Sequence, residues 1–134
     1  MKTAKLAIKG LSPMTGVGIG ASGKFSGELV FNTAMSGYPE ALTDPSYQGQ
    51  ILLFTFPLIG NYGISKDWFE SNKLQPVAII CSEIYTKPIH YHAIKPLEEL
   101  MLKHGVGGMI GVDTRYLTKV IRNHGTVVAT LTVT

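Results

Sequence analysis

The sequence predicts a single α/β domain that is rich in β-strands, with about six or seven strands and two main helices. Three observations support this class. Short apolar runs bounded by glycine and proline recur along the chain, as strands do. Two further segments carry apolar residues at helical spacing and end at a glycine. A chain of 134 residues with 45% hydrophobic and 16% charged residues fits one globular domain.

The predicted strands differ in how many faces they should bury. Strand patterns occur at residues 5–9, 29–33, 51–56, 77–81, 109–112 and 127–134. The first two alternate in polarity, as half-buried strands do, and we expect the first to be an edge or surface strand. The third and fourth are almost continuously apolar, which is typical of strands covered on both faces. In the last strand one face carries Val127, Ala129, Leu131 and Val133.

Two segments have the signals of helices. Residues 96–104 begin with a proline, carry acidic side chains early and stop before Gly105. Residues 114–124 follow Asp113, a good N-cap, and stop before Gly125. The apolar stripe of this second helix consists of Leu117, Val120 and Ile121.

The second helix also carries Arg115, Lys119 and Arg122 at positions i, i+4 and i+7, which lie on one face. Exposed charges are the default on helices, so we prefer to interpret this stripe as a solvated face. The alternative is a docking surface for an acidic partner, which makes these residues candidate interface residues.

The Gly-rich segment at residues 10–27 contains two phosphate-binding patterns. Residues 18–23 fit the dinucleotide fingerprint, and residues 18–24 nearly fit a P-loop. The fingerprint needs a following helix whose N-terminus holds the phosphate, whereas this segment leads into a strand. The near P-loop has Phe25 where a Ser or Thr hydroxyl should contact magnesium. We therefore expect no nucleotide here and predict a Gly-rich hairpin, with Val17 and Ile19 facing the core.

The cysteine and the histidines show no catalytic or metal-binding spacing. Cys81, the single cysteine, ends an apolar strand pattern and is expected to be buried and inert. His90 and His92 share one side of an extended segment but lack further ligands at zinc spacing. His104 and His124 each precede a glycine at a helix end, where capping or surface roles are expected. The sequence predicts no metal site.

The charge of the chain does not indicate binding to nucleic acid or to a membrane. The net charge of +3 is mild and the basic residues are scattered, so neither nucleic acid nor a membrane is expected to bind. The N-terminus has no apolar core of signal-peptide length, and no run approaches the ~20 residues of a membrane span. We expect a cytoplasmic protein.

The most informative stretch is residues 27–63, where two apolar runs flank a segment dense in Tyr, Pro, Gly and small polar residues. Three sequence segments are distinctive: NTAMSGYPEALTDPSYQGQI, PLIGNYG and, downstream, GVDTRYLTKVIRNHG. They resemble the N-terminal domain of the small subunit of glutamine-dependent carbamoyl-phosphate synthetase. The resemblance covers essentially residues 1–134 and is densest at residues 28–63 and 111–125.

The resemblance implies a non-catalytic domain that joins a C-terminal class I glutaminase domain, with a Cys-His-Glu triad, to a large subunit that uses ATP and magnesium. Nothing of that glutaminase domain is present in this chain, so no catalytic residue and no cofactor are expected here and the chain alone should be inactive. Ser46, in Asp44-Pro45-Ser46-Tyr47, matches the family serine that contacts bound glutamine. The match is weak over residues 81–96, so no family role passes to His90, His92 or Lys95.

Two functions of different class follow. The first is this synthetase domain, which serves carbamoyl phosphate formation for pyrimidine and arginine biosynthesis. The second is a free-standing module that reuses the same domain to bind another protein or a small molecule. Co-purification with the large subunit distinguishes them.

Overall fold

A computed structural model describes residues 2–32, 38–55, 58–59, 73–84 and 99–134. Seven of the described strands close into a barrel: β1 (Lys2–Ile8), β2 (Met14–Gly20), β3 (Gly23–Asn32), β4 (Ile51–Phe54), β6 (Ala78–Ile80), β8 (Gly107–Ile110) and β9 (Val128–Val133). A small second sheet pairs β5 (Leu58–Ile59) with β7 (Glu83–Ile84). The helical elements are α1 (Tyr38–Thr43), the 3-10 turn η1 (Pro45–Tyr47), residues 99–104 and α3 (Thr114–His124). This architecture confirms the predicted β-rich α/β domain.

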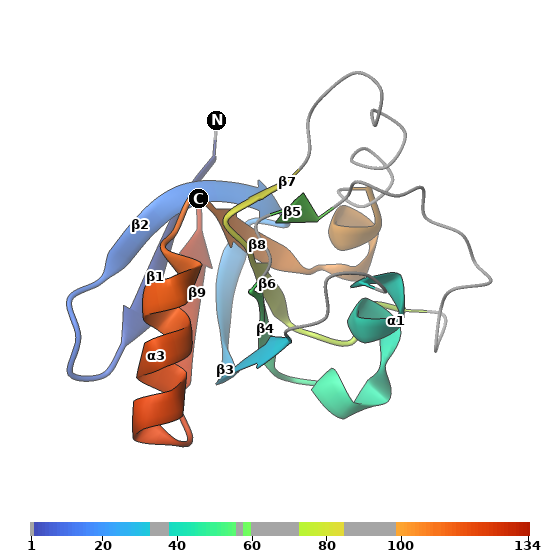
Figure 1. Ribbon diagram of the computed structural model, residues 1–134. Helices are drawn as coiled ribbons and strands as arrows, with labels where there is room; N and C mark the ends of the chain where they lie inside the picture. Colours follow the sequence, from blue (N-terminus) through green and yellow to red (C-terminus); the bar gives the residue numbers. More distant parts are fainter. Residues whose placement is uncertain (1, 33–37, 56–57, 60–72, 85–98) are drawn as a thin grey trace.

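The order of strands around the barrel is β1-β2-β8-β6-β4-β3-β9 (Figure 1). Neighbours from β8 through β6 and β4 to β3 run parallel, so the carboxyl ends of these four strands lie at one edge of the barrel. The last strand, β9, pairs antiparallel with both β1 and β3 and thereby closes the barrel. Strands from both ends of the chain therefore meet at this seam.

The barrel interior is filled by alternate residues of its strands, because successive side chains of a strand point to opposite faces. On β1 the residues Ala4, Leu6 and Ile8 point inward, and the residues between them are exposed. On β9 the inward face carries Ala129, Leu131 and Val133, as predicted from the sequence. Burial of this apolar surface is the main contribution to the stability of the barrel.

A second apolar cluster lies outside the parallel strands. On β4, Ile51 and Leu53 belong to the interior, whereas Leu52 and Phe54 pack in this outer cluster. Residues of α1 and of the helical segment 99–104 cover it, among them Leu42 and Met101. The continuously apolar run of β4 is thus explained by a strand buried on both faces, as predicted.

Helix α3 runs alongside β1 and β9 in Figure 1. Its apolar stripe of Leu117, Val120 and Ile121 packs in the barrel cluster, and its charged residues are exposed. The Asp113 side chain accepts a hydrogen bond from the Tyr116 backbone N–H at 3.1 Å, which caps the first turn. The backbone N–H of Gly125 donates to the Ile121 carbonyl at 3.0 Å, and the φ of 70° at Gly125 ends the helix. Both predicted helix ends are confirmed.

The predicted Gly-rich hairpin is wrong, because β2 and β3 are not neighbours in the barrel. Strand β2 pairs with β1 and β8, while β3 pairs with β9 and β4. Between them Gly20 has a φ of 70°, and a Cβ there would lie 2.5 Å from the Val106 carbonyl oxygen. The glycine is required by this close approach. Ile19 is buried as expected, but Val17 is only half-buried.

Some sequence-based expectations need correction or lie outside the described residues. Strand β1 is not an edge strand, because it has a hydrogen-bonded neighbour on each side, but one of its faces is exposed, as expected of a surface strand. His90, His92 and the first residues of the predicted helix 96–104 lie outside the described residues, and the rest of that helix is confirmed at residues 99–104. No helix in the described part of the chain is both long and apolar enough to cross a membrane.

Candidate functional site

The first candidate site is the turn that carries Ser46. Strand β3 leads toward α1, and α1 leads directly into η1, whose three residues precede β4. The Asp44 carboxylate accepts a hydrogen bond from the Ser46 backbone N–H at 2.9 Å, and Pro45 at the first position fixes the backbone there. The turn is therefore rigid at its first residues.

A side-chain contact anchors the other end of this turn. The Asn32 side chain at the end of β3 donates a hydrogen bond to the Tyr47 hydroxyl at 3.1 Å. Gln50, which follows the turn, donates to the Glu28 carboxylate at 3.3 Å. The turn is thus held at a fixed place beside β3, and a site built on it would be preorganised.

Ser46 itself is exposed, and within the described residues its hydroxyl makes no hydrogen bond. The common role of a serine in a turn is to satisfy a nearby backbone group, which this hydroxyl does not do. Its donor and its acceptor positions are therefore available to a group from outside the domain.

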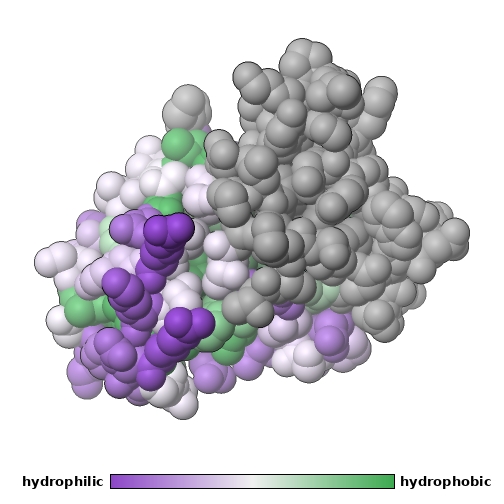
Figure 2. All heavy atoms as spheres, in the orientation of Figure 1, coloured by the Kyte–Doolittle hydropathy of each residue, from purple (hydrophilic) through white to green (hydrophobic). Residues whose placement is uncertain are grey.

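The second candidate site is a groove of about 240 Å³ along α3, which we call the basic groove. Its described lining residues are Thr55, Thr114, Arg115, Thr118, Lys119 and Arg122. Figure 2 shows hydrophilic side chains gathered over α3 on this face of the molecule. Arg115, Lys119 and Arg122 share one helix face, as their spacing predicts, and three threonines lie beside them in the groove.

The threonines of the basic groove differ in their hydrogen bonds. The Thr118 hydroxyl donates to the Thr114 carbonyl at 2.8 Å, and the Thr55 hydroxyl donates to the Asn32 carbonyl at 3.2 Å. Thr114 is only 7% exposed, and its hydroxyl makes no hydrogen bond within the described residues. Of the three, Thr114 alone can offer its proton to a ligand in the groove.

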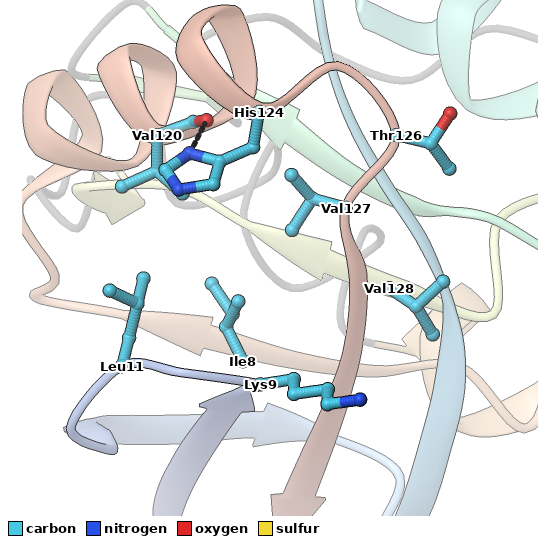
Figure 3. Close-up of a pocket in the computed structure, with 8 residues that line it drawn as sticks. All are labelled: Ile8, Lys9, Leu11, Val120, His124, Thr126, Val127 and Val128. Carbon is cyan, nitrogen blue, oxygen red and sulfur yellow. Dashed lines mark hydrogen bonds between the residues drawn. The ribbon is translucent and has the colours of Figure 1, made fainter.

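A second hollow, of about 260 Å³, lies where β1 ends and α3 meets β9 (Figure 3). Its walls are mainly apolar, and the His124 ring lies across from Ile8 and Leu11 (Figure 3). The Nδ1 of His124 donates to the Val120 carbonyl at 2.9 Å, as a residue that caps the helix end does. No carboxylate and no thiol lines this hollow within the described residues, so its chemistry is that of a packing groove.

The other candidate residues occupy structural positions. Cys81 is fully buried after β6, as predicted for an inert thiol. His104 does not cap its own helix: its Nδ1 accepts a hydrogen bond from the Leu74 backbone N–H at 2.9 Å, which requires the proton to sit on Nε2. In the described part of the chain, no group of three His, Cys, Asp or Glu residues could hold a metal ion.

The residues that complete the two sites could not be predicted from local sequence patterns. Asn32 and Tyr47 support the Ser46 turn, but their contact joins residues far enough apart that no local pattern indicates it. Thr114 and Thr118 gave a weak signal, since they are polar residues on the buried side of an amphipathic helix. The ring centroid of Phe31 lies 5.5 Å from the Arg122 guanidinium carbon. No sequence pattern indicates this contact.

Together these features define a mixed β-barrel domain with two candidate sites at its surface, the Ser46 turn and the basic groove. The chain belongs to the family described as carbamoyl-phosphate synthase small chain, CPSase domain, whose sequence model matches residues 6–131. The family resemblance seen in the sequence is thereby confirmed.

Individual relatives agree with this assignment. The carbamoyl phosphate synthase small chain of Methanosarcina mazei is 46% identical over 128 residues, which are 96% of this chain and 35% of that protein. The multifunctional protein CAD of Squalus acanthias is 48% identical over 123 residues, 85% of this chain and 6% of that protein. The chain thus spans about a third of the length of the small chains it matches.

One solved structure is similar in fold. The aminopeptidase from Aneurinibacillus sp. strain AM-1 matches with a TM-score of 0.50 and 15% sequence identity, over 99% of this chain and 30% of that one. At this level of identity the likeness concerns the fold alone and carries nothing about activity.

Proposed function

We propose that this chain is the non-catalytic domain of a glutamine-dependent carbamoyl-phosphate synthetase that docks the glutaminase domain onto the large subunit. The observation that carries the proposal is the family match over residues 6–131, together with identities of 45–48% to small chains and to a multifunctional protein. The large subunit would supply the ATP and magnesium sites, and this chain would supply the surfaces that bind the glutaminase domain and the large subunit.

Within that assembly we propose that Ser46 contributes to the glutamine site. The exposed turn and the uncommitted hydroxyl support this role, because a side chain that recognises a ligand across a domain boundary must be both fixed and free to bond. A hydroxyl can donate a hydrogen bond to the carbonyl or carboxylate oxygens of glutamine, and it can accept one from its amide or amino group.

We further propose that this chain alone hydrolyses no glutamine. A nucleophilic cysteine must reach its substrate and have a base or a cation beside it. Cys81 has no exposed surface and lies in the outer apolar cluster, so its thiol cannot reach a substrate.

The experiment that tests the function is reconstitution of carbamoyl phosphate synthesis from a glutaminase domain and the large subunit, with and without this chain. With glutamine as nitrogen donor, synthesis should require this chain, because the glutaminase must be docked for its ammonia to be used. With ammonia supplied directly, synthesis should proceed without it. Equal glutamine-dependent rates in both mixtures, or no co-purification with the large subunit, would favour the free-standing binding module instead.

A further inference from the structure

The basic groove on α3 is a charged surface that the domain does not neutralise by itself. Arg115, Lys119 and Arg122 are exposed, and none forms an ion pair with a described carboxylate. An isolated surface charge needs no partner, because water solvates it. Three cations around one hollow raise the local potential and attract an anionic group more strongly than scattered charges do.

The groove also offers hydrogen bonds that a solvated helix face lacks. Thr114 lies 7% exposed in its wall with an uncommitted hydroxyl, and Arg115 follows it directly. A carboxylate accepts hydrogen bonds from both a hydroxyl and a guanidinium, and such charge-assisted bonds are the strong ones. The Thr55 and Thr118 hydroxyls have already donated their protons, so Thr114 is the neutral donor.

The spacing of the charges decides what kind of anion fits. From Arg115 to Arg122 the helix rises about 10 Å, at about 1.5 Å per residue. A single phosphate or carboxylate is much smaller than this and would leave at least one of the three cations unused. Several carboxylates carried along one segment of protein match the row, as opposite charges across an interface do.

The residues of the basic groove are also held in place before a partner binds. Helix α3 is capped at both ends, and its apolar stripe is anchored in the barrel core. The Arg122 guanidinium lies over the Phe31 ring, a cation–π contact that limits its freedom before any partner arrives. Thr55 brings the carboxyl end of β4 to the same groove. Little conformational entropy would be lost on binding.

From these observations we infer that the basic groove binds an acidic segment of the large subunit, with carboxylates set against Arg115, Lys119 and Arg122 and one of them bonded to the Thr114 hydroxyl. This inference rests on the proposed function and adds to it the chemistry of the contact. The ion pairs of the groove each add a little to affinity, and they also orient the partner and speed association, because complementary charges steer the encounter.

The first test replaces Arg115, Lys119 and Arg122 together by Gln in the assembled synthetase and measures the affinity of the large subunit at low and high salt. Each exposed ion pair is worth about two- to threefold, so affinity should fall about tenfold at low salt. At high salt the difference should shrink, because salt screens exposed charges. The control is Lys5→Gln, Lys24→Gln and Lys103→Gln, which removes the same charge from exposed sites elsewhere and should change little.

The second test is a zero-length carbodiimide cross-link, which joins lysine amines to carboxylates in contact. Lys119 should link to an acidic peptide of the large subunit, identified by mass spectrometry. Lys119→Arg keeps the charge but has no reactive amine, so this link should disappear while affinity stays.

The outcomes separate the two proposals. If the wild-type chain does not associate with the large subunit, the proposed function itself is contradicted. Normal association with no effect of the triple Gln variant would overturn only the groove inference. Binding of inorganic phosphate at low millimolar concentration, lost in the triple Gln variant while association is unchanged, would make the groove a small-anion site and would equally overturn it.

Discussion

Single residues in this domain act by fixing the position of their neighbours. Asp44 and Tyr47 hold the Ser46 turn at its two ends, and Asn32 ties Tyr47 to the end of β3. None of these contacts is strong alone, since a neutral hydrogen bond contributes about 1 kcal/mol. Together they leave one exposed hydroxyl at a defined place.

The first prediction concerns Ser46. In the assembled synthetase, Ser46→Ala should remove one neutral hydrogen bond, about 1 kcal/mol, and so raise the KM for glutamine about fivefold. Synthesis with ammonia should be unchanged, because the glutaminase site is then bypassed. Steady-state kinetics with both donors measures this, with Ser12→Ala, another exposed serine, as the control. Equal losses with both donors would assign Ser46 to the fold instead.

The second prediction concerns His104, whose Nδ1 accepts the Leu74 N–H. His104→Phe should leave that buried N–H without an acceptor and lower the free energy of unfolding by about 1–3 kcal/mol. His104→Asn places an oxygen near the position of Nδ1 and should lose less. Urea denaturation of the two variants measures the difference. Equal stabilities would mean that the hydrogen bond contributes nothing.

At the scale of elements, α3 joins the core to the basic groove. Its apolar residues Leu117, Val120 and Ile121 lie in the barrel cluster, while its charged residues border the groove. The helix is only 11 residues long, so it would be marginal by itself and depends on its caps and its packing. Arg122 and His124 in its last turn interact favourably with the helix dipole.

The third prediction therefore concerns the cap of α3. Asp113→Ala should cost about 1 kcal/mol of stability, because the Tyr116 N–H loses its acceptor. Asp113→Asn retains a side-chain oxygen that can accept this hydrogen bond, and it should cost less. The midpoint of urea unfolding, with an unchanged m-value, checks both. If the alanine variant were as stable as the wild type, the cap would be dispensable.

At the scale of the whole molecule, stability depends on closing the barrel. Strand β9 lies between β1 and β3, so the seam joins the first and last strands in the chain. Among the described strands, closure leaves the barrel itself without an open edge on which another chain could add a strand. The interior residues of β9 therefore belong to a core shared by the whole barrel.

The fourth prediction compares two residues of β9. Leu131 has no exposed surface and Val128 is 63% exposed. Leu131→Ala should lower the free energy of unfolding by about 2–5 kcal/mol through lost burial and a cavity. Val128→Ala should change it by less than about 0.5 kcal/mol, as surface substitutions usually do. Similar losses in both variants would contradict the placement of Leu131 in the barrel interior.

Features that depend on local physics could be predicted from the sequence. Caps and glycines set the ends of α3, alternation set the faces of β9, and the continuous apolar run at residues 51–54 indicated a strand covered on both sides. Side-chain periodicity reports such facts directly, because each side chain has a fixed direction relative to its own backbone. The long sequence segments around Ser46 and α3 also indicated the family.

The neighbours of each strand could not be predicted from the sequence and are known from the barrel itself. Strand pairing is made by backbone groups that every residue carries, so nothing local distinguishes a β2–β3 hairpin from the observed pairing of β3 with β9. For the same reason the contact of Asn32 with Tyr47 and the meeting of Thr55 with Arg115 and Lys119 could not be predicted. These contacts join residues that are distant in sequence, and barrel closure brings them together.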